Sequence, residues 1–493
     1  MSTIHLWDNS WHVPPPNDDK KDSFGRKPRD LIIGKNSGIL KSLSSYTIGE
    51  LMQSEDNAVL VWPNSFQEGY DELKDQYIFR VSQKEGDKID SITTNNVVGF
   101  IGKEKTDIRI HSRFSSDKPD KKGDVNDFFL YHMLSKTMSI NMFNLPTSSG
   151  ADMAFDFLLF FFPKLLKEAM SQGLYKKYVY HEYNDANVRG VIDINRHIRR
   201  NIPANGRVAY RTREFSFDNP MTQLIRHTVE FIRRKPLGKA VLHNDADTEA
   251  CVQQIIQATP TFVARQQQSV INDNLRPVVH PYYTKYAALQ KLCLRILRHE
   301  KLSYGQTNDK IHGILIDAAW LWEEYVARVL AEKGTSLKHY TRKSRDYYLF
   351  KTENGKKFQQ IIPDYLDDNK DSKIVADAKY IPLNRYDHLD ADRASAVYYK
   401  TIMYMYRFNA EKGFLFHPCS QSDIEWIEKQ TELGHLEIDD KKTVSCDYQI
   451  VDREGCHLLE IGMVVPSNID YNAFKDSMSK VETAFVEKIS NQL

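Results

Sequence analysis

The sequence predicts a protein of mixed α and β structure, with a β-rich N-terminal domain, a mostly helical middle region and a compact C-terminal α/β domain. Three observations predict this order. Short apolar stretches alternate with turn residues as far as about residue 145. From about residue 150 the apolar residues recur at helical spacing. Beyond about residue 311 helical and strand patterns alternate, which is typical of a compact domain with a mixed sheet.

The composition is that of an ordinary globular protein. Of the 493 residues 41% are hydrophobic and 27% charged, which excludes a disordered, collagen-like or disulfide-scaffold chain. A formal net charge of +1 neither supports nor excludes a nucleic-acid partner, because the local distribution of charge decides that question. The five cysteines contain no CxxC pair, so we expect no zinc site and no disulfide framework.

The same features predict a cytoplasmic protein. Few, scattered cysteines fit a reducing compartment, and the N-terminus MSTIHLWDNSW lacks the layout of a signal peptide. The longest apolar run, Phe157 to Phe162, is far too short to span a bilayer. We therefore expect a buried helix there and no membrane contact.

The N-terminal part divides into a tail and a β-rich domain. Residues 1–30 are polar and carry the segment PPPNDDKKD, so we predict a flexible tail. Residues 31–147 contain the apolar stretches AVLVWP, QYIFRV, NVVGFIG and DIRIHSRF, which predict strands. A charged loop is expected at 115–124.

The middle region, residues 148–310, is predicted to be mostly helical. Apolar residues recur at helical spacing in Phe155–Met170, Met221–Arg234 and Thr284–Leu297. A β insertion is expected near 188–217. The region carries no internal repeat.

A basic block extends from residue 189 to residue 234. It holds ten arginines, four acidic residues and no lysine, a net charge of +6 in a chain of net +1. Arginine matches phosphate oxygens bidentately, so one interpretation is a track for the DNA backbone. The other is an internal Arg189–Asp193 pair, with the remaining arginines on solvated helices. We favour a mixture, in which Arg189 and Asp193 are structural and DNA is contacted by Arg196, Arg199 and Arg200.

The C-terminal domain, residues 311–493, begins with a predicted helix at Leu315 to Glu332. Strands are predicted at 346–351, 358–367, 373–381, 413–417 and near 457–464, and further helices at about 390–409 and 471–490. No GxxxxGK[ST] motif occurs, so we expect this chain to bind no nucleotide of its own.

The segment IIPDYLDDNKDSKIVADAKYI, residues 361–381, carries the most informative pattern. Two apolar strands flank a turn of polar residues, which favours a hairpin. A symmetric hairpin places Asp364 and Asp377 across from each other, with Cβ atoms roughly 5 Å apart. Lys379 lies two residues after Asp377 and therefore points to the same face.

Two carboxylates this close repel each other, and one is driven to protonate unless a cation binds. Hard oxygen ligands favour Mg²⁺, with Mn²⁺ as the alternative. A lysine beside such a metal can orient or deprotonate a water, or stabilise developing charge. The pattern P-D-(x)n-D-x-K is that of PD-(D/E)xK nucleases. The alternative is a surface hairpin with scattered charges, although charges that interrupt the apolar strand IVADAKYI are costly to bury without a purpose.

Two neighbouring helices supply further candidates. On the helix DAAWLWEEYVARVL, Glu323 borders an apolar stripe and could face the sheet as a third carboxylate, or could form a surface salt bridge. On the helix after the hairpin, Lys400 and Tyr404 share a face and could contact a phosphate. The alternative for this pair is a packed tyrosine beside a solvated lysine.

Several blocks of the chain resemble the McrC family, the nuclease subunits of modification-dependent (5-methylcytosine) restriction systems. The resemblance covers about residues 90–420 and rests on NVVGFIGKEKTDIRIHSRF, VRGVIDINRHIRRNIP, REFSFDNPMTQLIRHTVEFI, LWEEYV, PDYL and ADAKY. It puts Glu323, Asp364, Asp377 and Lys379 at the family's nuclease positions. Two departures occur: Ser112-Arg113 stand where Pro-Lys is usual, and Lys400 stands where glutamine is common.

The resemblance implies a C-terminal restriction-endonuclease-like domain of the PD-(D/E)xK type. It also implies that Mg²⁺ is held by Asp364, Asp377 and Glu323, and that Lys379 positions or activates the water. The implied partners are DNA and a separate McrB-like AAA+ GTPase ring, into which the N-terminal β domain docks. Arg113 or a lysine of the 115–124 loop is a candidate for contact with that ring. Double-strand cutting further suggests that two nuclease domains dimerise on DNA.

Two other functions stay open. The chain could be a non-catalytic adaptor that only stimulates an AAA+ NTPase, although the intact Asp364, Asp377 and Lys379 argue against it. It could also be a stand-alone DNA repair nuclease of the same fold, although the large N-terminal β domain favours a partner.

Overall fold

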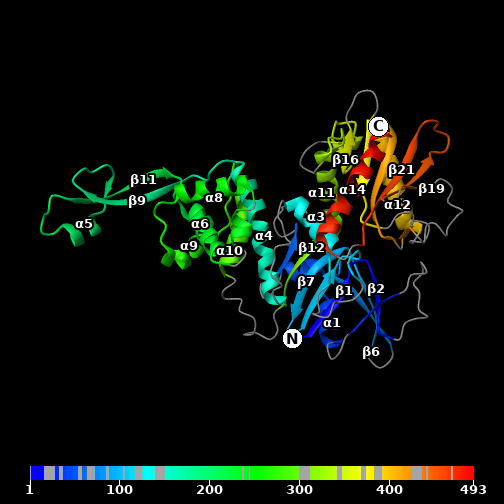
Figure 1. Ribbon diagram of the computed structural model, residues 1–493. Helices are drawn as coiled ribbons and strands as arrows, with labels where there is room; N and C mark the ends of the chain where they lie inside the picture. The colour runs from blue at the N-terminus through cyan, green and yellow to red at the C-terminus, as the bar shows by residue number, and fades with distance from the viewer. Residues whose placement is uncertain are drawn as a thin grey trace. The chain divides into compact units, whose positions relative to one another are not determined.

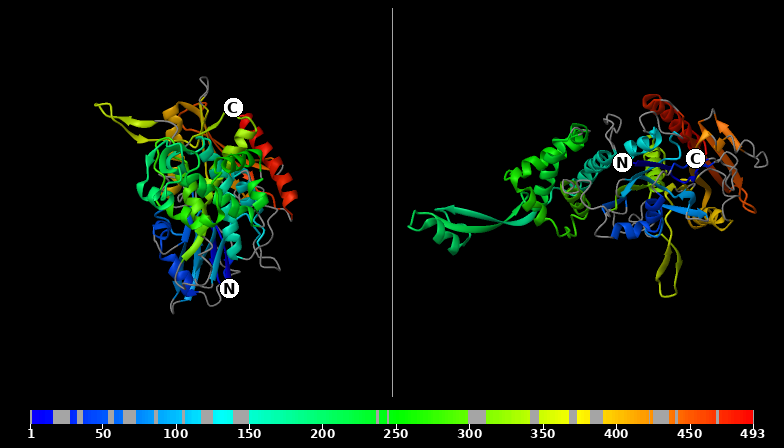
Figure 2. Two further views of the ribbon diagram at one scale, coloured as in Figure 1. Left: turned by 90° about the vertical axis from the view of Figure 1, so that its left-hand side faces the viewer. Right: turned by 90° about the horizontal axis from the view of Figure 1, so that it is seen from below.

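The structure, a computed structural model, divides into two compact units (Figure 1, with further views in Figure 2). The first unit joins Met1–Thr137 to Thr307–Leu493, and the second is Met138–Gln306. None of the helices in the described part of the chain is long and apolar enough to cross a membrane. The structure describes residues 2–15, 28–32, 37–53, 58–63, 73–84, 88–103, 106–116, 125–138, 150–235, 238–243, 245–298, 311–340, 347–367, 373–381, 391–421, 423–424, 436–439, 442–467 and 470–492.

Two sheets form the N-terminal part of the first unit. One has the strand order β1-β8-β7-β12-β4 and the other the order β3-β2-β6-β5. The strands are β1 (Ser2–Trp7), β2 (Trp11–Val13), β3 (Arg29–Asp30), β4 (Ala58–Trp62), β5 (Phe79–Lys84), β6 (Lys88–Thr94), β7 (Val97–Lys103), β8 (Thr106–His111) and β12 (Ile311–Asp317). The β-rich character predicted for this region is confirmed.

Residues 2–13 correct the prediction of a flexible tail. They form β1 and β2, and β1 pairs in parallel with β8 over its whole length. The physical reason is the alternation in STIHLW, which buries Ile4 and Leu6 on one face of the sheet. The Pro-rich segment that suggested a tail begins only after these strands, and its residues 16–27 lie outside the described part.

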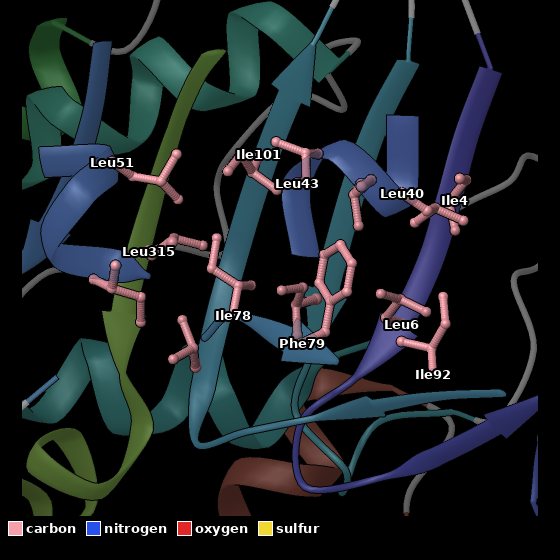
Figure 3. Close-up of a cluster of buried hydrophobic side chains, with 14 of the residues drawn as sticks. Ile4, Leu6, Leu40, Leu43, Leu51, Ile78, Phe79, Ile92, Ile101 and Leu315 are labelled. Atoms are coloured by element: carbon pink, nitrogen blue, oxygen red, sulfur yellow. The ribbon is translucent and has the colours of Figure 1, made fainter. Parts of the chain in front are cut away.

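Apolar side chains from both sheets meet in one core with helices α1 (Ser37–Ser44) and α2 (Ile48–Gln53) (Figure 3). Leu315 of β12 belongs to this core, because β12 lies between β7 and β4. The helix predicted from Leu315 therefore starts later, as α11 (Ala318–Glu332). Asp317 caps it by accepting hydrogen bonds from the backbone N–H groups of Ala319 and Trp320, at 2.9 and 3.2 Å.

A seven-stranded mixed sheet forms the C-terminal part of the first unit, in the order β13-β16-β17-β18-β21-β20-β19. Its strands are β13 (Lys338–His339), β16 (Tyr365–Asp367), β17 (Lys373–Ala378), β18 (Ala410–Cys419), β19 (Leu436–Asp439), β20 (Thr443–Gln449) and β21 (His457–Val464). A separate ribbon pairs β14 (Tyr348–Lys351) with β15 (Lys357–Gln360). The sequence predicted most of these strands but missed β13, β19 and β20.

Helices cover both faces of this sheet. On one face α12 (Ala391–Phe408) packs on β17 and β18, and its Met405 joins Leu366 and Val375 in a common core. On the other face Tyr365 donates a hydrogen bond to the backbone carbonyl of Glu323 in α11. α14 (Tyr471–Ser490) packs beside α11 and β21. Side chains of β16 and β17 therefore point alternately to α12 and to α11.

The second unit is mostly helical, as the sequence predicts. Its elements are α4 (Gly150–Met170), β9 (Lys177–Asp185), β10 (Val191–Ile192), α5 (Ile194–Asn201), β11 (Val208–Ser216), α6 (Pro220–Arg233), α7 (Gly238–Leu242), α8 (Ala246–Ala258), η2 (Ala264–Gln266), α9 (Gln267–Asp273) and α10 (Tyr286–Arg298). β9 and β11 form a long antiparallel ribbon that extends from these helices and carries α5 at its far end (Figure 1). We call β9, β10, α5 and β11 the arm.

A buried carboxylate joins three helices of the first unit. Glu482 of α14 lies 2.8 Å from His132 Nε2 of α3 (Phe128–Met138) and 2.7 Å from Lys136 Nζ. Tyr325 of α11 donates a hydrogen bond to the same carboxylate at 2.6 Å. Burial alone would raise the pKa of Glu482, but the hydrogen bond from His132 and the charge of Lys136 lower the pKa to about 2.

The stability of the first unit is expected to fall in acid because of Glu482. A carboxyl whose pKa is lower in the folded state binds fewer protons there, so its contribution is complete above its ordinary pKa of 4.5 and is lost as the pH falls toward about 2. This contribution is on the order of 3 kcal/mol. Urea unfolding of wild type and Glu482→Gln at neutral pH and near pH 3 measures it, with exposed Glu487→Gln as the control. An equally steep acid dependence in Glu482→Gln would contradict the assignment.

Candidate active site

The paired strands β16 and β17 place two carboxylates opposite each other. Tyr365, Leu366 and Asp367 pair with Ala376, Val375 and Ile374. One residue further in the same register, Asp364 lies opposite Asp377. The predicted hairpin register is therefore confirmed, although the turn residues 368–372 lie outside the described part. The carboxylate of Asp364 also accepts a hydrogen bond from the backbone N–H of Ala378 at 2.8 Å.

Two lysines meet the carboxylate of Asp377. Lys379 Nζ forms an ion pair with Asp377 Oδ2, and Lys400 Nζ of α12 lies 3.5 Å from the same oxygen. Asp377 is fully buried, whereas the side chain of Lys400 is 48% exposed. The backbone N–H of Lys379 donates to the carbonyl of Phe416 at 2.8 Å, which fixes the end of β17 against β18.

The electrostatics of the pair separate the two carboxyl groups. Burial, the Asp377 carboxylate and the more distant Glu323 carboxylate raise the pKa of Asp364 well above its usual range. Burial opposes ionisation of Asp377 as well, but Lys379 and Lys400 lower the pKa of Asp377 to about 2. The pKa of Lys379 is raised: burial opposes its charge, and the carboxylates of Asp377 and Asp364 favour it more strongly. Lys379 is therefore an ammonium group.

The site fits a divalent cation held by two carboxylates. Asp377 Oδ1 is buried and has no hydrogen-bond partner among the described residues. The described part of the chain contains no group of three or more His, Cys, Asp or Glu side chains arranged to hold a metal ion. Mg²⁺ does not need such a group, because it is usually bound by one or two carboxylates together with waters and substrate phosphates.

The third predicted carboxylate, Glu323, forms an ion pair with His339 and lies near enough to Asp364 to raise the pKa of that carboxyl. Glu323 Oε1 lies 2.9 Å from His339 Nε2, and α11 packs on the face of the sheet opposite to that of Asp364. Burial opposes the charged form of His339, but the hydrogen bond that its imidazole donates to the Glu323 carboxylate raises the pKa of His339. The sequence correctly predicted that Glu323 lies near the sheet. Its contact with His339 could not be predicted, because His339 lies on another element, β13.

Tyr404 packs inside the domain, which was the alternative to its predicted contact with a phosphate. Its side chain is buried, and its hydroxyl donates a hydrogen bond to the carbonyl of Ile362 at 2.8 Å. That bond holds the segment between β15 and β16 that leads to Asp364. Lys400 lies 5.5 Å from the centre of the Tyr404 ring and remains half exposed beside Asp377. Of this pair Lys400 is the exposed member, whereas Tyr404 is buried.

The arm corrects two predictions about the basic block. Arg196 donates to the carbonyls of Tyr183 and Tyr210 and pairs with Glu182 at 2.7 Å, so its guanidinium is used inside the arm and is not directed at DNA. Arg189 does not pair with Asp193. Its guanidinium lies 3.8 Å from Asp185.

Asp193 is structural in a different way from the one predicted. It caps α5 by accepting a hydrogen bond from the backbone N–H of Arg196 at 3.1 Å. Arg199 and Arg200 are exposed on α5, as their predicted role requires. Apolar side chains are exposed around them: Val191, Ile192, Ile194, Ile198 and Ile202.

A junction that the sequence did not reveal lies next to Lys379. The ring of Tyr380 stacks under the Arg113 guanidinium, with 4.2 Å from Cζ to the ring centre, and Arg113 also pairs with buried Asp8 at 3.7 Å. Burial raises the pKa of Asp8, although Arg113 favours its charged form. The guanidinium of Arg113 thus makes its contacts inside the first unit, and this argues against the suggested contact of Arg113 with a partner. The three residues are more than 100 positions apart along the chain, so no local pattern could join them.

Comparisons with known proteins place the chain in a family. A family model described as the McrBC 5-methylcytosine restriction system component matches residues 92–418. No curated protein matches the chain. Two solved structures from Thermococcus gammatolerans are similar. One, a refined half-complex from a tetradecameric assembly of McrB AAA+ hexamers with bound McrC, is 15% identical, covers 100% of both chains and has a TM-score of 0.46.

The other is a cryo-EM structure of the McrBC complex, which is 16% identical, covers 67% of this chain and 87% of that chain, and has a TM-score of 0.26. The family model alone covers more than half of the sequence and contains both Asp364 and Asp377. The resemblance read from the sequence blocks is thereby confirmed, and the chain belongs to the family of McrBC 5-methylcytosine restriction system components.

Proposed function

We propose that this chain is the Mg²⁺-dependent DNA endonuclease subunit of a McrBC-like restriction complex, and that its C-terminal sheet is a PD-(D/E)xK nuclease domain. One observation carries the proposal. Asp364 and Asp377 lie opposite each other on paired strands, with Lys379 and Lys400 at the same carboxylate. A buried carboxylate pair with one unpartnered oxygen is costly unless it serves a cation.

Asp364 and Asp377 would hold Mg²⁺, or Mn²⁺ in its place. When bound, the metal supplies charge for the transition state of phosphodiester hydrolysis. Lys379, as an ammonium group, donates hydrogen bonds, so it positions the attacking water and stabilises developing charge rather than accepting a proton. Lys400 is placed to contact a neighbouring phosphate oxygen. In-line attack would leave a 5′-phosphate and a 3′-hydroxyl.

The proposed partner is a McrB-like AAA+ GTPase ring. Family membership supports it, and the sequence itself contains no GxxxxGK[ST] motif with which to bind a nucleotide. Cleavage of both DNA strands would require two nuclease domains, so we also propose that two such domains meet on DNA.

The exposed end of the arm supports a second interpretation of Arg199 and Arg200. A phosphate track needs cations and gains little from exposed isoleucines. Ile194, Ile198 and Ile202 are 67%, 51% and 64% exposed beside these arginines. An exposed apolar patch rimmed by charge is typical of a protein-docking surface. We therefore propose the protein partner as the first contact of the arm, with DNA as the alternative.

Cleavage of plasmid DNA by this chain and its co-expressed AAA+ partner tests the function. With Mg²⁺ and GTP we expect cutting of methylated but not unmethylated DNA, and no cutting when the partner or nucleotide is left out. Stimulated GTP turnover without any cleavage, in Mn²⁺ as well, would favour the adaptor. Cleavage of DNA ends by the chain alone would favour the repair nuclease. Loss of GTPase stimulation in Arg199→Gln/Arg200→Gln would assign the arm to the partner.

A further inference from the structure

The ribbon formed by β14 and β15 is the most exposed element of the C-terminal sheet region. Its two strands pair only with each other among the described strands. Every residue from Phe350 to Gln360 is exposed. The ribbon, drawn in yellow-green, projects away from the first unit in the right-hand view of Figure 2. A lone two-stranded ribbon is marginally stable in water, so its retention calls for a function.

The base of the ribbon is firmly held. The carbonyl of Tyr348 accepts a hydrogen bond from Arg407 Nε of α12 at 2.9 Å. The ring of Tyr347 lies 4.8 Å from that of Phe408, and its carbonyl accepts from the backbone N–H of Ile361 at 3.0 Å. The base of the ribbon is therefore fixed to α12 and to the segment that leads to Asp364.

The ribbon leaves the fold at the edge of the candidate active site. Only three residues separate Gln360 from Asp364, and the two Cα atoms can be at most about 13 Å apart in an extended chain. The backbone carbonyl of Asp364 accepts from the N–H of Tyr340, so β13 and β16 pair just inside the point where the ribbon begins. A duplex whose phosphate lies at Asp364 and Asp377 must pass close to the ribbon.

The side chains of the ribbon match DNA. Lys351 and Lys357 are direct cross-strand partners, and Lys356 precedes the second strand. Like charges directly opposite each other are destabilising, and neither Lys351 nor Lys357 forms an ion pair among the described residues. Lys357 instead lies 6.0 Å from the centre of the Tyr348 ring. Phosphates would neutralise both lysines. Phe350 and Phe358, also cross-strand partners, are 54% and 47% exposed, with ring centres 5.2 Å apart.

We propose that the β14–β15 ribbon binds the DNA substrate by entering the major groove beside the scissile phosphate. The major groove is about 12 Å wide and admits a two-stranded β-ribbon. Lys351, Lys356 and Lys357 contact phosphates, and Phe350 and Phe358 pack against the groove wall. A protein partner would explain the phenylalanines but not the opposed lysines. This assignment rests on the nuclease function proposed above.

Binding of a fluorescein-labelled DNA duplex to the full chain tests the ribbon, with Ca²⁺ in place of Mg²⁺ so that no cleavage occurs. For Lys351→Gln/Lys357→Gln we expect roughly tenfold weaker binding, and a slope of log affinity against log salt concentration reduced by about two. Phe350→Ala is expected to weaken binding without a change in slope, because an apolar contact releases no counterions. Lys475→Gln/Lys480→Gln, on exposed positions of α14, is the matched control.

An affinity and salt slope equal to those of wild type in the ribbon variants would overturn the assignment. So would an equal change in the α14 control, because the effect would then be general charge. Unchanged DNA binding together with lost stimulation of the partner's GTPase would make the ribbon a protein contact. Because binding is measured without cleavage, an inactive wild type that still binds through the ribbon would remove the nuclease function and leave this assignment standing.

Discussion

Replacing Asp377 with alanine is expected to abolish DNA cleavage and to leave the fold intact. Asp377 is the only acidic side chain in contact with both Lys379 and Lys400 among the described residues, and its Oδ1 is the unpartnered oxygen of the site. Asp377→Ala removes a ligand of the proposed metal and the group that orients both lysines. Loss of one charge-stabilising group typically costs about 10²–10³-fold in rate, and loss of the metal as well should cost more.

Folding should survive this change because the site is not held by Asp377. The ladder between β16 and β17 is formed by backbone groups, and removing one of two opposed carboxylates relieves the repulsion that raises the pKa of Asp364. Asp367→Asn is the matched control. Asp367, in β16, is buried like Asp377, but its side chain points to the opposite face of the sheet. Plasmid cleavage with the AAA+ partner and Mn²⁺ binding by calorimetry are the measurements. Cleavage by Asp377→Ala at the wild-type rate would reject the assigned site.

The parts of the site that lie close together in sequence could be predicted from the sequence. Asp364, Asp377 and Lys379 share one hairpin, so the position of the turn determines the register and the alternation of side chains determines the face. The helix bearing Lys400 follows directly and its spacing was also readable. These predictions needed only the two-residue period of a strand and the 3.6-residue period of a helix.

The failures have one physical cause, because pairing with a distant segment decides the local conformation. Arg189 and Asp193 have the spacing of a helical pair, yet Gly190 and the strand β10 intervene and α5 starts only at Ile194. A Cβ at Gly190 would lie 2.3 Å from the carbonyl oxygen of Arg211, so this chain must pass close to β11. Counting charges along the sequence likewise could not predict that Arg196 donates hydrogen bonds to two backbone carbonyls.

β12 illustrates the same cause on a larger scale. Its sequence IHGILID could belong to a helix or to a strand, and the pairing that decides between them is with β7 and β4, more than 200 residues earlier. The strand enters the N-terminal sheet and α11, which carries Glu323, follows it without a break. The sheet that forms the N-terminal core thus also sets the start of the helix next to the candidate active site.

Gly99→Ala is expected to destabilise the first unit by about 3 kcal/mol or more, because the added methyl group disrupts the pairing of β7 with β12. Gly99 lies opposite Leu315, and a Cβ there would lie 2.2 Å from the carbonyl oxygen of Ile314. The φ angle of +132° adds a backbone conformation that alanine rarely adopts. A loss of this size is a large part of the 5–15 kcal/mol that typically stabilises a domain.

Gly334→Ala separates the two causes. Gly334 also has a positive φ, +75°, but no atom lies within 4 Å of its ideal Cβ. We expect it to cost only about 1 kcal/mol, the backbone component alone. Urea unfolding followed by tryptophan fluorescence compares the two, since Trp62 of β4 and Trp320 of α11 both adjoin the C-terminal end of β12. Equal losses in both variants would mean that backbone conformation, and not the close approach of β12 to β7, makes glycine necessary at position 99.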